Sequence, residues 1–159
     1  MSVSNVITIL FLITALFIFT RPDKLPYMDL QVNHDGQPSD IHRAVGGLCD
    51  NEKCLTVYVS PSCPTSPRIT SMLISLVAEL EKDNIKTNII VGSDPTDKVN
   101  YFAKRYPFDV LLDPSGHFFR KANLEYTPTF IVTNNKGDII RKQSTAYLSP
   151  VDMRKKLKI

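Results

Sequence analysis

The sequence contains few of the residues that mark cofactor and nucleotide sites. Only six of its 159 residues are glycine, and none of them forms a Gly-rich phosphate-binding loop. Histidine and cysteine number three each, and they do not occur at the spacing of zinc ligands. The net charge is +3, and no basic stripe interleaves with aromatic residues. We therefore expect no cofactor, no metal site and no nucleic-acid partner.

Charged residues are missing from the amino-terminal end of the chain. Residues 6–19, "VITILFLITALFIF", are uncharged, and a helix over residues 3–20 would be about 27 Å long, close to the ~30 Å hydrocarbon core of a bilayer. A cleaved signal peptide would need a basic start and a small-residue cleavage site, and neither is present. The pattern favours an uncleaved transmembrane anchor at residues 1–20 over a signal peptide or a buried core helix.

Residues 21–47 resemble a tether in composition. They hold three prolines, three glycines and few large apolar residues, with turn signals at "HDGQP". We predict a linker here, followed by a single domain over residues 48–159. The two histidines of this segment, His34 and His42, are interpreted as solvated residues because no partner stands at ligand spacing.

The remaining segments alternate between strand and helix patterns. The predicted strands are residues 54–61, 85–92 and 108–116, the predicted helices are 66–82 and 95–106, a hairpin occupies 129–143, and a last helix begins after Ser149 as N-cap. Alternating strands and helices indicate parallel pairing with helices on both faces, and the hairpin adds antiparallel edge strands. The predicted class is α/β with a mixed sheet.

Three segments carry a resemblance to a known family. Cys63 stands at a strand-to-helix junction in "SPSCPTSP". Residues 103–130, "AKRYPFDVLLDPSGHFFRKANLEYTPTF", lead to Thr-Pro-Thr, and a hairpin follows in "FIVTNNKGDIIR". The stretch 54–159, about two thirds of the chain, resembles the thioredoxin-like superfamily, in particular its membrane-anchored thioredoxin-like and thiol-antioxidant branch. The resemblance implies a thioredoxin-like fold and thiol–disulfide exchange.

The resemblance also implies roles for individual residues. Pro128 matches the family's cis-proline, which lies against the active cysteine and leaves the backbone of the preceding residue, Thr127, free to pair with an extended substrate. Cys63 would be the nucleophile, and the implied catalytic set is Cys63, Ser66 and Pro128, with Thr127 binding substrate. The implied partner is a cysteine-containing client protein or redox partner.

The site departs from the family pattern at its second cysteine. Cys-x-x-Cys is replaced by Cys63-Pro64-Thr65-Ser66, and a hydroxyl cannot form a disulfide. A single thiol can still open a disulfide, hold a mixed disulfide or reshuffle bonds when another thiol releases it. Because Pro67 suits the first position of a helix, we expect Ser66 to act mainly as an N-cap and Cys63 to be a thiolate-prone residue at the helix start.

Two other functions stay open. A catalytically silent thioredoxin-like module that binds partners in a membrane assembly is suggested by the missing second cysteine and by the absence of tryptophan before the motif. A thiol peroxidase is suggested by "CPT" and by Ser60, three residues before Cys63. Thr56, however, stands where those enzymes place a proline.

The three cysteines divide into a pair and a single residue. Cys49 and Cys54 are five residues apart across a polar turn and could close a disulfide, whereas Cys63 follows Cys54 by nine residues of extended chain, up to ~30 Å. We expect a structural Cys49–Cys54 disulfide, with a second redox couple as the alternative. Either favours an oxidising compartment. Although Arg21 and Lys24 after the apolar segment point the other way, we place the domain on the periplasmic, extracytoplasmic side.

Overall fold

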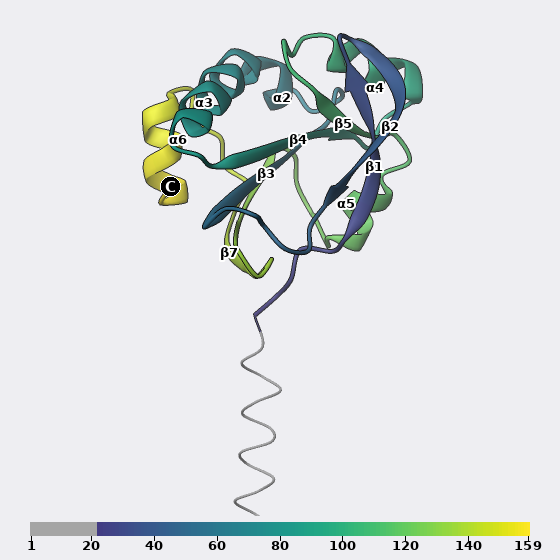
Figure 1. The fold of residues 1–159 in the computed structure, drawn as a ribbon. Helices are drawn as coiled ribbons and strands as arrows, with labels where there is room; N and C mark the ends of the chain where they lie inside the picture. The colour runs from purple at the N-terminus through teal and green to yellow at the C-terminus, as the bar shows by residue number, and fades with distance from the viewer. Residues whose placement is uncertain (1–21) are drawn as a thin grey trace, which may run out of the picture.

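The sheet is the frame of the domain. In the computed structural model, which describes residues 22–159, seven strands form one sheet in the order β2-β1-β5-β4-β3-β6-β7 (Figure 1). The strands are β1 (Met28–His34), β2 (Gln37–Val45), β3 (Lys53–Val59), β4 (Lys86–Gly92), β5 (Val110–Asp113), β6 (Thr129–Asn134) and β7 (Ile139–Gln143). The three central strands are parallel, and the two outer pairs are antiparallel to their neighbours. The mixed α/β sheet expected from the sequence is confirmed.

Helices cover both faces of this sheet. They are α2 (Thr65–Arg68), α3 (Thr70–Lys82), α4 (Thr96–Ala103), α5 (His117–Lys121) and α6 (Pro150–Leu157). Figure 1 shows α3 and α6 above the sheet and α5 below it. The last helix begins as expected, because the Ser149 hydroxyl accepts a hydrogen bond from the Asp152 N–H.

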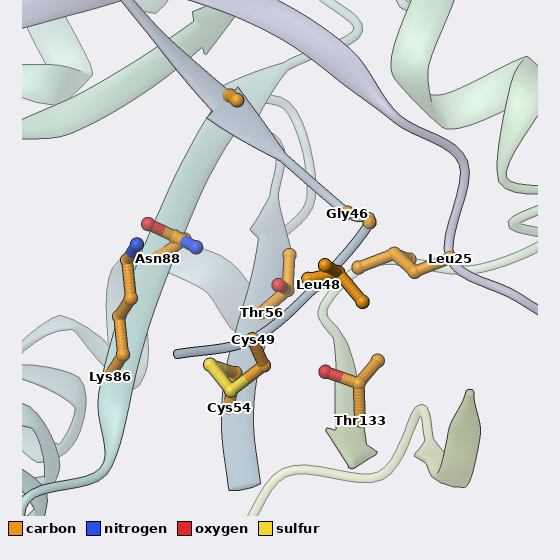
Figure 2. Close-up of a pocket in the computed structure, with 11 residues that line it drawn as sticks. Leu25, Gly46, Leu48, Cys49, Cys54, Thr56, Lys86, Asn88 and Thr133 are labelled. Carbon is orange, nitrogen blue, oxygen red and sulfur yellow. A yellow bond between two sulfur atoms is a disulfide. The ribbon is translucent and has the colours of Figure 1, made fainter. Parts of the chain in front are cut away.

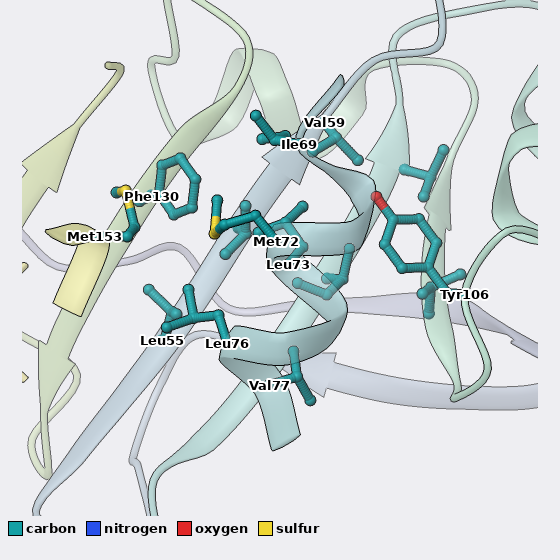
Figure 3. Packing of buried hydrophobic residues seen from close by; sticks show 14 of the residues in the cluster. Leu55, Val59, Ile69, Met72, Leu73, Leu76, Val77, Tyr106, Phe130 and Met153 are labelled. Carbon is teal, nitrogen blue, oxygen red and sulfur yellow. The ribbon is translucent and has the colours of Figure 1, made fainter. Parts of the chain in front are cut away.

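The core has two halves because neighbouring residues of a buried strand point to opposite faces. In β3, Leu55, Val57 and Val59 face α3, α4 and α6, and Tyr58 faces α5. Figure 3 shows the first half, where Leu73, Leu76 and other apolar residues of α3 pack onto the sheet. In the second half, Tyr58 stacks near Phe118 with a distance of 6.2 Å between ring centroids.

The predicted linker is wrong, because residues 28–45 form the β1–β2 hairpin. Leu30 and Val32 are 6% and 1% exposed in the second half of the core, and β1 pairs with β5. The turn is Asp35-Gly36, with φ of 49° and 76° at the two residues, the left-handed conformation of a tight hairpin. The proline and glycine content that suggested a tether therefore belongs to a turn and its flanks.

Two further features differ from the expected elements. Residues 117–121, which showed no clear pattern, form α5, because the Asp113 carboxylate accepts hydrogen bonds from the His117 and Phe119 N–H groups at 2.8 and 3.2 Å. The helix predicted over residues 66–82 is divided at Ile69, where ψ is 1°.

The predicted anchor, residues 1–20, lies outside the described residues. Among the helices of residues 22–159, none is both long and apolar enough to cross a membrane.

Candidate functional site

Cys63 lies in the turn that joins the end of β3 to α2. Its N–H donates to the Ser60 carbonyl at 3.1 Å, and its own carbonyl accepts from the Ser66 N–H at 3.1 Å. These two bonds wind the chain from the strand into the helix within a few residues. The sulfur therefore lies at the carboxyl end of a central parallel strand, ahead of the first helical N–H groups.

The turn brings Cys63 against a distant loop. The Cys63 thiol donates a hydrogen bond to the Thr127 carbonyl at 2.9 Å. The Thr127–Pro128 peptide bond is cis, as the sequence predicted, and β6 begins at the next residue, Thr129. Three of the predicted site residues are thus neighbours in space, and Cys63 is the one free cysteine among residues 22–159, with its side chain half-buried.

The surroundings of the sulfur favour its ionised form. Burial raises the pKa of Cys63, but hydrogen bonds from the Thr127 side chain, from the Ser66 and Thr65 N–H groups and from the Ser66 hydroxyl outweigh it. The pKa of Cys63 consequently lies below the ordinary value of a thiol. N–H groups at a helix start supply part of this effect, as the sequence suggested.

Ser66 does not cap the helix, so this part of the prediction is wrong. Helix α2 already begins at Thr65, with Pro64 as its N-cap, and no side chain caps it. Pro64 itself has helical angles, φ −59° and ψ −26°, because the turn at Cys63 starts the helical winding earlier than the position of Pro67 suggested. Ser66 is instead fully buried, and its hydroxyl accepts a hydrogen bond from the Ser60 N–H at 3.2 Å.

Asp94 belongs to the site and escaped the sequence analysis. Its carboxylate accepts hydrogen bonds from the Ser60 hydroxyl at 2.5 Å, from the Ser62 N–H at 3.0 Å and from the Ser62 hydroxyl. Burial raises the pKa of Asp94, but these hydrogen bonds and the charge of Lys98 lower it by more. The carboxyl group therefore stays ionised. The available signal was its position just after β4, because parallel neighbours such as β3 and β4 end at the same edge of the sheet.

The disulfide predicted between Cys49 and Cys54 is present, with a Cα–Cα distance of 6.0 Å. Figure 2 shows it beside a small hollow that includes Thr56, Asn88 and Thr133. The hollow has a volume of about 30 Å³, which is room for a water molecule or two. Because the two cysteines are 8% and 7% exposed, a client protein cannot reach their sulfur atoms without local opening, which favours a structural role.

His34 pairs with a carboxylate from another part of the chain. His34 lies 2.7 Å from Asp109, which also accepts a bond from Arg43 at 2.8 Å. These contacts raise the pKa of His34 and lower that of Asp109, and they tie the β1–β2 hairpin to the loop before β5. Within residues 22–159, no group of His, Cys, Asp and Glu side chains is arranged to hold a metal ion.

Comparison with known proteins identifies the fold. No family model and no curated protein matches the sequence. Solved structures do match: a thiol-disulfide oxidoreductase from Bacteroides fragilis is 15% identical, with a TM-score of 0.59 over 85% of this chain and 99% of that one. StoA from Bacillus subtilis is 13% identical, with a TM-score of 0.60 over 84% and 98%. A secreted Mycobacterium tuberculosis disulfide oxidoreductase is 14% identical, with a TM-score of 0.52 over 67% and 81%.

At these identities the likeness concerns the fold. It agrees with the central parallel strands, the terminal hairpin and the cis-proline loop that faces the strand-to-helix turn. The chain therefore has a thioredoxin-like fold, and its solved structural neighbours include thiol–disulfide oxidoreductases.

Proposed function

We propose that this protein carries out thiol–disulfide exchange with Cys63 as its single nucleophile. The observation that carries the proposal is the position of the free Cys63 sulfur, 2.9 Å from the Thr127 carbonyl and beside cis-Pro128. The lowered pKa of Cys63 increases the fraction of thiolate, the form that attacks disulfides. Oxidoreductases among the structural neighbours support the same chemistry.

The exchange needs no outside oxidant or reductant. The Cys63 thiolate attacks one sulfur of a client disulfide, the client S–S bond breaks, and its electron pair leaves with the second client sulfur as a thiolate. A Cys63–client mixed disulfide results. A second thiolate of the client then attacks the client sulfur of the mixed disulfide, forms a new client disulfide and releases the Cys63 thiolate. Because Ser66 cannot perform that release, the net result is rearrangement of client disulfides rather than their oxidation or reduction.

Thr127 is proposed to bind the client backbone. It lies just before the ladder of β6, and among the described residues its N–H donates no hydrogen bond. Its carbonyl accepts a hydrogen bond from the Cys63 thiol while the thiol is neutral. Ionisation of Cys63 removes that donor, so both polar groups of Thr127 become available to an extended client strand in the same step that activates the nucleophile.

Residues 1–20 are proposed to tether the domain to a membrane on its extracytoplasmic side. The Cys49–Cys54 disulfide suits an oxidising compartment, and one structural neighbour is described as secreted. Residues 23–25 run along the β6–β7 turn, where the Leu25 N–H donates to the Gly137 carbonyl at 3.2 Å. This turn adjoins the first residues of β3, whereas Cys63 follows its last, so the site would face away from the tether. Intact-mass measurement and sedimentation test this: a soluble chain beginning near Arg21 would contradict it.

Trapping tests the exchange itself. Protein isolated from its native compartment after an acid quench should carry disulfide adducts on non-reducing gels, and Cys63→Ser should abolish them. The Cys49–Cys54 disulfide remains in both chains, so adducts that persist in Cys63→Ser would contradict the assignment of the nucleophile.

A silent binding module is the second candidate, favoured by the buried hydroxyl of Ser66 where a second thiol would stand. A measured pKa of Cys63 near the free value of ~8.5 would support the silent module, and a value below ~7 the exchange protein. The peroxidase alternative has less support, since the Ser60 hydroxyl donates to Asp94 and is not left for the sulfur.

A further inference from the structure

A groove opens between α2 and α4 at the same end of the domain as Cys63. Figure 1 shows these two helices together at the top of the view. The groove has a volume of about 440 Å³, and its apolar walls are Pro61, Pro67, Tyr101 and Phe102. Tyr101 is 70% exposed, so most of its ring is open to contact with another molecule. The walls therefore offer a site for an apolar side chain from outside the molecule.

Residues that line the groove are close neighbours of Cys63 in the chain or act on its neighbours. Pro61 precedes Cys63 by two residues, and Pro67 belongs to the helix that Cys63 starts. On the other wall, Lys98 acts on the charge of Asp94, whose carboxylate holds the Ser62 N–H at 3.0 Å. Ser62 is the residue next to Cys63. A client segment bound in the groove would therefore need only a few further residues to reach the Cys63 sulfur.

The rim of the groove carries an excess of positive charge. Lys98 and Arg105 line it against the single carboxylate of Asp97, and neither cation forms an ion pair among residues 22–159. Arg105 lies over the Phe102 ring, with its guanidinium carbon 5.1 Å from the ring centre, so its charge is held at the apolar wall. An occupant with an apolar side chain beside an acidic one would satisfy both features.

We propose that this α2–α4 groove selects the client: it binds a client polypeptide segment in which an apolar and an acidic residue stand close to the reacting cysteine. This inference rests on the proposed exchange function and names the substrate class for the same site. The apolar side chain packs between Pro67 and Tyr101, the acidic one pairs with Lys98 or Arg105, and the client sulfur is thereby brought to Cys63. Binding in the groove raises the local concentration of the client disulfide without changing the chemistry of the thiol.

Two synthetic peptides of equal length test the proposal. Each carries one cysteine as a mixed disulfide with thionitrobenzoate, preceded by Leu-Asp in one peptide and by Leu-Lys in the other. Attack of the Cys63 thiolate on the peptide sulfur releases coloured thionitrobenzoate and leaves the peptide bound. The acidic peptide should react faster, by up to about fivefold for each cation it meets, and added salt should reduce the difference.

Charge reversal supplies the variants. Lys98→Glu with Arg105→Glu should abolish or invert the preference between the two peptides. Lys104→Glu is the matched control, because Lys104 lies at the end of the same helix but does not line the groove, and it should keep the preference. Tyr101→Ala should slow both peptides, since both carry leucine. Each peptide rate is divided by the rate at which the same variant reacts with the neutral reagent 4,4′-dithiodipyridine, so a change in the reactivity of the thiol itself cancels from the comparison.

The outcomes separate the two proposals. If Cys63 reacts with neither the peptides nor dithiodipyridine, the exchange function fails. If dithiodipyridine reacts but the two peptides react equally in the natural chain, or if the preference survives the double charge reversal, the exchange function stands and the groove proposal is overturned.

Discussion

The Cys63 thiol and the Thr127 carbonyl share one hydrogen bond of 2.9 Å across 64 positions of the sequence. The bond exists only while the thiol is protonated, because a thiolate has no hydrogen to donate. Ionisation of Cys63 therefore does two things at this site: it creates a nucleophile and it frees an acceptor on the adjacent loop. Both changes occur at one place and in one step. This suits a site that must bind a client backbone and attack its disulfide together.

The first prediction concerns the pH dependence of Cys63. Burial raises its pKa, but hydrogen bonds from the Thr127 side chain and from Ser66 and Thr65 at the helix start lower it by more. The rate of alkylation by iodoacetamide should therefore reach half its maximum at lower pH in the folded protein than in urea-unfolded protein. By the same linkage, ionised Cys63 stabilises the fold above the pKa of the unfolded chain, and this contribution is lost as the pH falls through the folded pKa. A folded midpoint at or above the unfolded one would contradict the prediction.

A second prediction separates the hydrogen bond of Ser66 from a capping role. Ser66→Ala leaves the buried Ser60 N–H without its acceptor, which should lower the free energy of unfolding by about 1–3 kcal/mol. It should also raise the pKa of Cys63, because the hydroxyl helps to lower it. Thr65→Ala, at an exposed neighbouring position, is the control and should change stability by less than about 0.5 kcal/mol. Urea unfolding and the alkylation profile measure the two effects, and equal losses in both variants would count against this role.

The third prediction tests the β1–β2 hairpin as part of the core. Leu30→Ala removes a side chain that is 6% exposed, and it should lower the free energy of unfolding by about 2–5 kcal/mol. Ile41→Ala on β2, where the side chain is 60% exposed, should cost less than about 0.5 kcal/mol. A flexible linker would make both substitutions neutral, so the difference in urea midpoint between the two variants decides the matter.

The β1–β2 hairpin also shows which parts of the fold sequence patterns predict and which they miss. The central strands and α3 have long apolar patterns, which predicted them directly. Residues 28–34 also alternate, with Leu30 and Val32 inward, and Asp35-Gly36 is a strong two-residue hairpin signal. The surrounding prolines and polar residues outweighed this signal in the prediction. The pairing of β1 with β5 could not be inferred locally, because it joins strands that are far apart in the chain.

The site also contains some residues whose role the sequence predicts and others whose role it does not. Cys63, Thr127 and Pro128 stand in recognisable motifs, and the structure brings them together. The position of Ser66 depended on where the helix starts, which is set by backbone angles at Pro64 rather than by the identity of Pro67. Asp94 has no motif at all. Its role comes from the parallel register of β3 and β4, which places the residues after both strands at one edge of the sheet.

The last prediction asks whether the turn retains the geometry of a dithiol site. Ser66 is buried one position into α2, its hydroxyl helps to lower the pKa of Cys63, and its N–H bonds to the Cys63 carbonyl. A sulfur introduced by Ser66→Cys would therefore lie beside the nucleophile, and Pro67, within the first turn of the helix, does not turn the side chain away. We expect Cys63 and the introduced cysteine to form a disulfide in an oxidising glutathione buffer. The variant should also gain dithiol reductase activity that the natural chain lacks.

Thr65→Cys is the matched control for that variant, since it brings a cysteine one residue closer along the chain but at an exposed position. Its introduced thiol should stay open to alkylation, whereas the thiol introduced by Ser66→Cys becomes protected. Intact mass after alkylation distinguishes the two, because each free thiol adds one alkyl group and a disulfide adds none. If Ser66→Cys alkylates at both introduced and natural thiols even under strongly oxidising conditions, the turn lacks dithiol geometry. The turn would then differ from an oxidoreductase site, and the silent binding module would become the better account of the site.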